Sequence, residues 1–232
     1  MTTQQPLTHI PVLDKGFVEL LDAMGDDNAI VAAARVSFLG ESKGQERDKK
    51  LLFYLMKHDH GTPFEMVVFK FRARAPEVVF RQWVRHRIGS FNVQSRRYTE
   101  VEETDFHYPS AWRLQSESNK QGSEGVAPDD VSAELSAKLD AVYKACAEAY
   151  QRALAHGIAR EQARLFLPGF AVYSTFIWTV NARALMNFLR LRLGADAQWE
   201  IQEYARAIWS IFRERVPWTA EAFEQFQLHR ED

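Results

Sequence analysis

The sequence lacks most features that would place it in a specialised class of protein. Cys146 is the only cysteine among 232 residues, which excludes an intrachain disulfide and a cysteine-rich metal site. No apolar run is long enough to span a bilayer, and residues 1–10 show no signal-peptide pattern. We therefore expect a soluble cytoplasmic protein with no membrane partner and no metal.

Common nucleotide-binding and metal-binding signatures are also missing. The sequence contains no Rossmann glycine fingerprint, no P-loop and no metalloprotease histidine pair. Any nucleotide must therefore be bound by another architecture. Hydrophobic residues make up 46% of the chain, which is enough for a proper core, and we predict a single domain over residues 1–232.

One stretch is rich in a single kind of charge, although the formal net charge of the whole chain is only −2. Five arginines lie between Arg81 and Arg97, without a lysine and among serine, asparagine and glutamine side chains. Guanidinium groups repel one another, stay protonated and form planar donor forks that suit phosphate or carboxylate. The stretch therefore predicts an anion-binding site, with structural ion pairs and a nucleic-acid patch as the alternatives.

The spacing of apolar residues predicts a largely helical chain. Asn181 is expected to cap one helix, and Asp129 or Asp130 a long one that buries a single apolar stripe including Cys146. The predicted helices cover residues 15–24, 29–38, 46–58, 76–87, 130–157, 160–167, 182–192, 198–213 and 218–226.

Two segments have the pattern of strands. Residues 66–74 alternate between apolar and polar side chains, and residues 172–180 are dense in aromatic and β-branched side chains. Residues 115–127, rich in Ser, Gly, Asn and Gln, predict a mobile surface loop. Few strands and no βαβ repetition predict an α+β fold.

Some polar residues have both a functional and a structural interpretation. His60 follows a predicted helix, where a histidine either acts on a ligand or simply occupies the surface. Arg192 lies near a helix end, where the helix dipole alone would account for a cation. Cys146 lies directly between Ala145 and Ala147 on an apolar stripe, so we interpret it as a core residue rather than a nucleophile.

The sequence Arg85-His86-Arg87, followed after seven residues by Ser95, resembles the signature of the flavin-dependent thymidylate synthases. The similarity extends over nearly the whole chain, which makes chance an untenable explanation. The further similar blocks are residues 15–20, 60–65, 81–83, 163–164, 167–168, 178–183, 185–188 and 197–200.

The resemblance implies an antiparallel sheet flanked by helices in a protomer that forms a homotetramer with sites shared between subunits. It implies reductive methylation of dUMP to dTMP without a cysteine nucleophile. The carbon donor would be 5,10-methylenetetrahydrofolate, leaving as tetrahydrofolate, and FAD would carry electrons supplied by NADPH. The implied partners are dUMP, folate and further copies of the chain, with no nucleic acid and no membrane.

Matching positions receive expected roles from the resemblance. Arg192 is expected to be catalytic, because a guanidinium beside uracil N3 and O2 favours ionisation at N3 and stabilises negative charge on the ring. The residues expected to bind dUMP are Gln82, Trp83, Val84, Arg85, Gln94, Ser95, Arg96, Arg97, Arg164 and Arg192. The residues expected to bind FAD are His60, Thr62, Arg85, His86, Arg87, Val93, Asn181, Ala182, Arg183 and Asn187.

The chain departs from the family pattern at two positions. At Val93 relatives often carry Glu or Gln, and at Asp196 some relatives carry histidine. Ser95 is expected to hydrogen-bond dUMP rather than attack it, because no Ser-His-Asp constellation can be assigned around it. Two other functions stay open, namely a non-catalytic nucleotide- or RNA-binding module and a flavin oxidase that no longer methylates.

Overall fold

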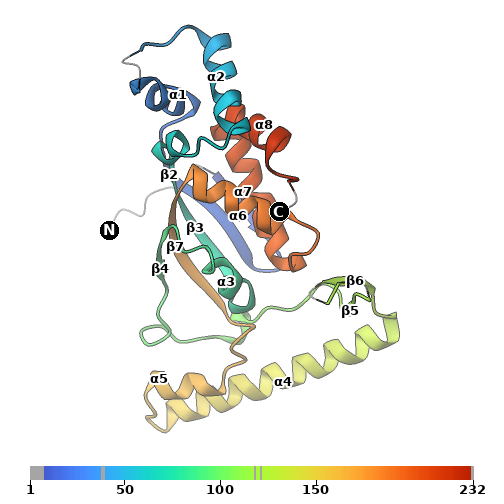
Figure 1. Ribbon diagram of the computed structural model, residues 1–232. Helices are drawn as coiled ribbons and strands as arrows, with labels where there is room; N and C mark the ends of the chain where they lie inside the picture. Colours follow the sequence, from blue (N-terminus) through green and yellow to red (C-terminus); the bar gives the residue numbers. More distant parts are fainter. Residues whose placement is uncertain (1–7, 38–39, 118, 121, 231–232) are drawn as a thin grey trace.

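The computed structural model describes residues 8–37, 40–117, 119–120 and 122–230 (Figure 1). Its centre is a five-stranded sheet of order β1-β2-β3-β7-β4, in which every pair of neighbours is antiparallel. This confirms the predicted α+β class. The strands are β1 (Thr8–Val12), β2 (Gly16–Met24), β3 (Val68–Pro76), β7 (Tyr173–Asn181) and β4 (Ser90–Val93).

Helices α6 and α7 lie along one face of the sheet, and α1, α2 and α8 gather at one end (Figure 1). Among the described residues, no helix is both long enough and apolar enough to cross a bilayer. The helices are α1 (Asp27–Val36), α2 (Gln45–Lys57), α3 (Glu77–Trp83), α4 (Asp129–Ala155), α5 (Arg160–Ala163), α6 (Ala182–Leu193), α7 (Trp199–Arg215) and α8 (Pro217–Phe226), with 3₁₀ turns η1 (Thr62–Met66), η2 (Glu103–Asp105) and η3 (Arg164–Phe166).

The core between the sheet and the helices is aromatic. Side chains alternate along β3 as the sequence predicts, so that Phe69 and Phe71 are buried on the inner face. Trp83, at the end of α3, lies edge-on to Trp178 of β7 with ring centroids 5.5 Å apart, and 5.3 Å from Phe188 of α6. These contacts hold α3, β7 and α6 in fixed relation to one another.

The prediction of a helix over residues 15–24 is wrong, because this segment is β2. The strand's register shifts between Leu20 and Asp22, and Leu20 and Leu21 are both buried. An irregularity of this kind breaks the strict alternation of a strand and imitates helical spacing. Strand β1, which pairs with β2 at the edge of the sheet, contains a proline, and edge strands tolerate proline. With five residues it is too short to show an alternating pattern of apolar and polar side chains.

Four other boundaries differ from the prediction. Helix α3 ends at Trp83 rather than at residue 87, and β4 lies where a loop was expected. Residues 160–167 divide into α5 and η3. The segment 115–127 contains much of a hairpin of β5 (Arg113–Gln115) and β6 (Ser123–Val126). Residue 38, the last of a predicted helix, lies outside the described residues.

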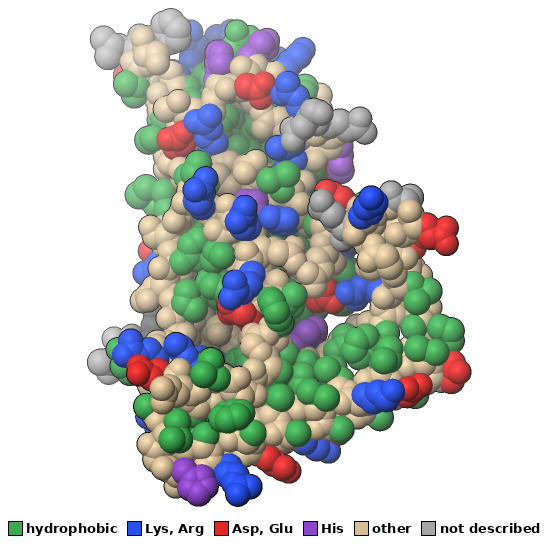
Figure 2. Space-filling model, turned by 60° about the horizontal axis from the view of Figure 1, so that its bottom comes forward, with side chains coloured by type: hydrophobic (Ala, Val, Ile, Leu, Met, Phe, Trp, Pro, Cys, Tyr) green, Lys and Arg blue, Asp and Glu red, His purple; other side chains and the backbone are tan. Residues whose placement is uncertain are grey.

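The long helix α4 is confirmed, but its predicted buried stripe is only partly buried. Tyr143 and Tyr150 pack into a second, smaller core with Phe106. By contrast, Val131 and Val142 are 38% and 54% exposed. Figure 2 shows hydrophobic side chains gathered along α4, which forms an arm at the bottom of Figure 1. The residue before the helix is Pro128, not an aspartate, and no side chain caps it.

Candidate active site

The first group of predicted site residues meets where α3 and α6 end. We call Gln82, Arg85, His86 and Arg192 the α3 cluster. Arg192 donates from Nε to Nε2 of His86 at 3.0 Å and from Nη2 to the backbone carbonyl of Gln82 at 3.4 Å. The neighbouring ring of Trp83 packs on both β7 and α6. Residues about a hundred positions apart are therefore held in contact.

His86 is uncharged in this setting. Burial, and then the positive charge of Arg192, lower the pKa of His86 to about 4. A neutral imidazole has one acceptor nitrogen, and the contact with Arg192 makes that nitrogen Nε2, so that the proton lies on Nδ1. Burial also lowers the pKa of Arg192, with Arg85 acting in the same direction and Asp196 opposing, but an arginine keeps its charge.

Two guanidinium groups of the stretch have no carboxylate partner within the described ranges. Arg85 and Arg87 lie exposed on the loop after α3, and no ion pair joins either of them to the described part of the chain. The loop passes very close to the sheet. If Gly89 were replaced by a residue with a side chain, its Cβ would lie 2.7 Å from Nε1 of Trp178. The fold therefore presents two unneutralised cations at the surface, as an anion-binding site requires.

A second group, the β4 cluster, comprises Gln94, Ser95, Arg97 and Arg164. Gln94 is fixed to the beginning of β7, because its backbone N–H donates to the carbonyl of Thr175 at 2.9 Å. Arg97 lies 3.4 Å from the carboxylate of Glu161, and Nε of Arg164 donates to the Glu161 carbonyl at 3.2 Å. Both arginines are exposed, so a stronger anion can replace these contacts.

Arg96 differs from its neighbours in sequence. Its guanidinium donates to the carbonyl of Tyr173 and lies 3.5 Å from Asp105, which also accepts from Arg74 at 2.7 Å. The side chain is only 12% exposed. The structure therefore gives Arg96 a structural role and leaves little of its side chain for a ligand.

Four other predicted residues are also limited by their burial or their position. The side chains of Trp83 and Ala182 are fully buried, so only their backbone atoms are available to a ligand. Val84 is half-buried, and Val93 is exposed beside a shallow recess that includes Asn92.

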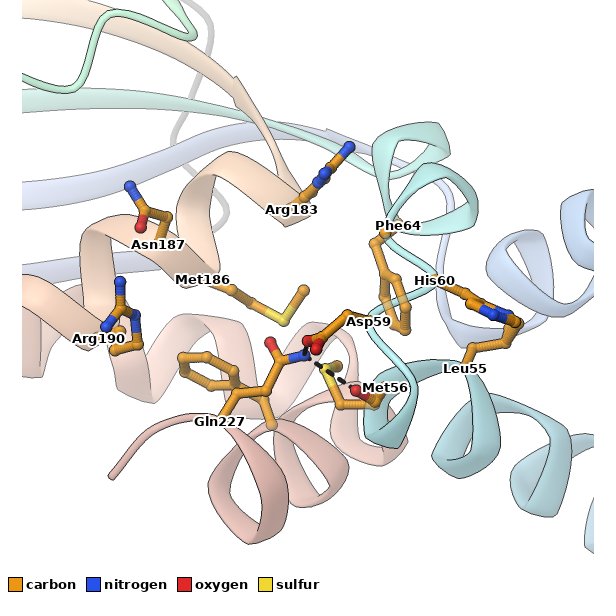
Figure 3. Close-up of a pocket in the computed structure, with 12 residues that line it drawn as sticks. Leu55, Met56, Asp59, His60, Phe64, Arg183, Met186, Asn187, Arg190 and Gln227 are labelled. Carbon is orange, nitrogen blue, oxygen red and sulfur yellow. Dashed lines mark hydrogen bonds between the residues drawn. The ribbon is translucent and has the colours of Figure 1, made fainter. Parts of the chain in front are cut away.

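A third group, the α6 cluster, comprises His60, Thr62, Asn181, Arg183 and Asn187. Figure 3 shows Arg183 and Asn187 projecting from α6 beside a pocket of about 200 Å³ that His60 also lines. The side chain of Asn181 caps α6 by accepting from the N–H of Ala184 at 2.9 Å, as predicted.

Close packing also shapes this pocket. Arg183 pairs with Glu65 at 2.6 Å. A Cβ added at Gly61 would lie 2.5 Å from Nε of Arg183, so a larger residue there would require the guanidinium to move. The blocks of family similarity include Gly61 and Glu65, but no role was predicted for them because their partner lies more than a hundred residues away.

The β4 and α6 clusters are separated within a protomer. Gln94 of the β4 cluster contacts Thr175 of β7, whereas Asn181 of the α6 cluster ends that strand. The six residue steps between Thr175 and Asn181 span about 20 Å at ~3.3 Å per residue. Within the described ranges, no group of three or more His, Cys, Asp or Glu side chains could hold a metal ion.

The structure is thus an α+β protein that presents cations without ion pairs among the described residues, and comparison with known proteins identifies the family. Residues 19–218 match the family described as thymidylate synthase complementing protein. The flavin-dependent thymidylate synthase of Thermosipho africanus is 49% identical over 215 residues, 93% of each chain. That of a Thermus thermophilus strain is 51% identical over 223 residues, 96% of this chain and 80% of the relative. The chain belongs to the flavin-dependent thymidylate synthase family, which confirms the resemblance.

A solved structure agrees with this assignment. The UMP/dUMP methylase PolB from Streptomyces cacaoi, bound with 5-Br UMP, superposes with a TM-score of 0.83. It is 37% identical, and the match covers 94% of this chain and 98% of that one.

Replacement of His86 by glutamine should flatten the pH dependence of stability in mildly acidic solution. An unfolded histidine takes up a proton near pH 6.5, whereas folded His86 does so only near pH 4. Between these values the unfolded state binds the extra proton, so stability falls as pH falls. Denaturant unfolding at several pH values from 4 to 7 would measure the slope. The exposed His156→Gln variant serves as control, and an unchanged slope in His86→Gln would contradict the neutral imidazole.

Proposed function

We propose that this protein converts dUMP to dTMP by reductive methylation. The carbon would come from 5,10-methylenetetrahydrofolate, and NADPH would supply electrons through FAD. The observation that carries the proposal is Arg192 held by neutral His86 beside unpaired Arg85, in a chain of this family. A structural neighbour that is a UMP/dUMP methylase bound with 5-Br dUMP supports the choice of substrate.

The chemistry explains why an arginine would carry the reaction. C5 of uracil is a weak nucleophile until negative charge builds on the ring, and a fixed guanidinium beside N3 and O2 stabilises that charge. Arg192 is already oriented by two acceptors of its own chain, so little reorganisation accompanies substrate binding. Cys146 is half-buried on α4, in the arm that packs on the smaller core, which argues against a cysteine adduct.

The residues present fit a flavin. The pocket that Gly61, Arg183 and Asn187 line, together with the exposed guanidinium of Arg87, suits a diphosphate and a planar ring. Thr62, Asn181 and Asn187 would add polar contacts, and His60 would lie in the flavin and folate region. When bound, FAD supplies the redox chemistry, while the protein binds and orients it.

We propose that the sites are shared between the subunits of a homotetramer. The pocket beside Arg183 is about 200 Å³, and a hollow of about 990 Å³ that Thr62 lines shares His60 with it. The support for shared sites is the separation of the β4 and α6 clusters along β7, which a contact from a second copy would bridge. The α3 and β4 clusters would meet across subunits on one dUMP. The exposed Val131 and Val142 of α4 also suit burial against another copy.

Purified protein should form dTMP from dUMP only when FAD, NADPH and methylenetetrahydrofolate are all present. Omitting each in turn under anaerobic conditions, with dTMP measured by chromatography, tests the reaction directly. NADPH oxidation without dTMP would identify an oxidase that no longer methylates. A protein that cannot be loaded with FAD and binds RNA with a steep salt dependence would identify a nucleic-acid module instead.

Arg192→Ala should keep FAD but lose most dTMP formation, by about a hundredfold or more, because one donor to the charged transition state is removed. Cys146→Ala should change the rate by less than about twofold, since this half-buried thiol on α4 is not among the residues expected to bind dUMP or FAD. Flavin absorbance gives the loading and single-turnover assays give the rate. Loss of turnover in a folded, FAD-loaded Cys146→Ala protein would contradict the mechanism.

Mixing two inactive variants should restore part of the activity if the sites are shared. In an equal mixture of Arg85→Ala and Arg97→Ala chains, about a quarter of the sites would combine an intact arginine from each chain. Unfolding and refolding the mixture allows the chains to exchange, and either variant refolded alone is the control. Full inactivity of a mixture shown to contain mixed oligomers would place both arginines in one protomer's site.

A further inference from the structure

Helix α2 ends in a turn that carries His60 to the pocket beside Arg183. The N–H of Asp59 donates to the carbonyl of Met56 at 3.3 Å, and the N–H of His60 donates to the carbonyl of Leu55 at 2.9 Å. Asp59 itself lies in the left-handed region, with a φ of 58°. This is the Schellman arrangement, in which the left-handed position is usually glycine. The chain therefore carries a carboxylate where the backbone alone favours a residue without a side chain.

The carboxylate of Asp59 binds two side chains from the segment that follows α8. Nε2 of Gln227 donates to Oδ1 of Asp59 at 2.9 Å and to the carbonyl of Met56 at 2.9 Å, and Figure 3 draws both bonds. Nη1 of Arg230 donates to the other carboxylate oxygen, Oδ2, at 3.0 Å. We call Asp59, Gln227 and Arg230 the turn anchor. It joins residues about 170 positions apart in the sequence.

The turn forms part of the wall of the pocket. Asp59, His60 and Gly61 line it together with Arg183 and Asn187 of α6. A Cβ added at Gly61 would lie 2.5 Å from Nε of Arg183, so the backbone of the turn packs directly on this guanidinium. His60 also lines the larger hollow of about 990 Å³. A shift of the turn would therefore change the shape of both hollows.

The turn anchor combines a partly shielded hydrogen bond with an exposed ion pair. The side chains of Asp59 and Arg230 are 59% and 60% exposed, and such pairs are weak in isolation. Gln227 is half-buried, and its second acceptor is the carbonyl of buried Met56. A strained backbone conformation persists where the surrounding structure holds it. The amide of Gln227 and the guanidinium of Arg230 supply that support to the left-handed residue.

We propose that the turn anchor positions His60 and Gly61 for FAD. Its three members are positioning residues, because they act through the turn that they hold. This inference rests on the proposed function, since it assumes that FAD binds beside Arg183. A site that is formed in only a fraction of the chains binds its ligand more weakly by that fraction. The segment after α8 thereby sets the affinity of a pocket that also involves α2 and α6.

Asp59→Gly separates the turn anchor from the backbone of the turn. Glycine adopts the left-handed conformation without strain, so the variant keeps its turn but loses the carboxylate that binds Gln227 and Arg230. The dissociation constant of FAD, measured by flavin fluorescence during titration of the full chain, should rise about tenfold. If Asp59 only repelled an anionic cofactor from the pocket wall, its removal would tighten FAD binding, and this result would overturn the proposal.

Arg230→Met breaks the same contact from the other side. Among the described residues that line the pocket, Arg230 does not occur, so its effect on FAD passes through Asp59. The dissociation constant of FAD should rise about threefold, which is the size of effect that an exposed ion pair supports. The double variant should bind FAD as Asp59→Gly does. Effects that multiply in the double variant would show that Arg230 acts independently, against the proposal.

Lys49→Met is the matched control. Lys49 lies in the first half of α2 and pairs with Glu221 of α8 at 2.6 Å, so the variant removes another ion pair between the same two regions. It should bind FAD as the parent does. A merely structural role of Arg230 would lower the midpoint of thermal unfolding and leave FAD binding unchanged, which would overturn the proposal.

Amide hydrogen exchange reports on the turn without any activity assay. The His60 N–H, which donates to Leu55, should exchange faster in Arg230→Met and at the parental rate in Lys49→Met. Equal rates in all three proteins would contradict the turn anchor. If Asp59→Gly fails to fold, Arg230→Met still decides.

The parent protein separates this inference from the proposed function. If the parent binds no FAD or forms no dTMP, the proposed function is wrong and the inference falls with it. If the parent binds FAD and forms dTMP, while Asp59→Gly and Arg230→Met bind FAD as tightly as the parent, only the turn anchor is wrong.

Discussion

The packing of Trp83 between β7 and α6 is the contact on which the candidate site depends. Its ring meets Phe176, Trp178, Phe188 and Tyr204, all of them buried. A large buried aromatic side chain of this kind contributes about 3–5 kcal/mol relative to alanine. Gln82 and Val84 are the sequence neighbours of Trp83, and His86 follows three residues later. The packing of the Trp83 ring therefore fixes the backbone that carries the polar side chains of the α3 cluster.

Some of the arginines near Trp83 carry positive charges that no ion pair neutralises within the described residues. Arg85 and Arg87 stay without carboxylates among the described residues, and the nearest partner of Arg192 is an imidazole that burial keeps neutral. An uncharged acceptor orients a guanidinium without cancelling its charge. Asp196 acts on Arg192 electrostatically, but no ion pair joins the two among the described residues, whereas Glu200 pairs with Arg113. The positive charges of Arg85 and Arg87 thus stay unbalanced at the proposed nucleotide site, whereas that of Arg113 is balanced by Glu200.

The arrangement of the sheet separates groups that the reaction would need together. Antiparallel pairing places β3 beside β7 over nine residues, from Val68↔Asn181 to Pro76↔Tyr173, and the predicted ligand residues lie at both ends of this pair. In the proposed homotetramer, one copy's α3 cluster would meet another's β4 cluster. The partly exposed apolar face of α4 is consistent with such an assembly.

The sequence by itself determined much of this protein. The alternation in β3, the aromatic run of β7, the cap at Asn181 and the arginine-rich stretch all follow from local patterns, and the similar blocks identified the family. The local pattern gave a wrong prediction at β2, because the shift in its register makes the spacing of buried residues resemble that of a helix. It also missed β4, which is too short to show the alternation of a strand. Only the tertiary structure decided which arginines are available: Arg96 is turned toward Asp105 and Tyr173, whereas its neighbour Arg97 faces solvent. The contact of Arg192 with His86, and that of Gln82 with Gln198, also became visible only in the tertiary structure. Contacts between residues about a hundred positions apart leave no periodic pattern in a sequence, because they arise from the packing of the whole chain.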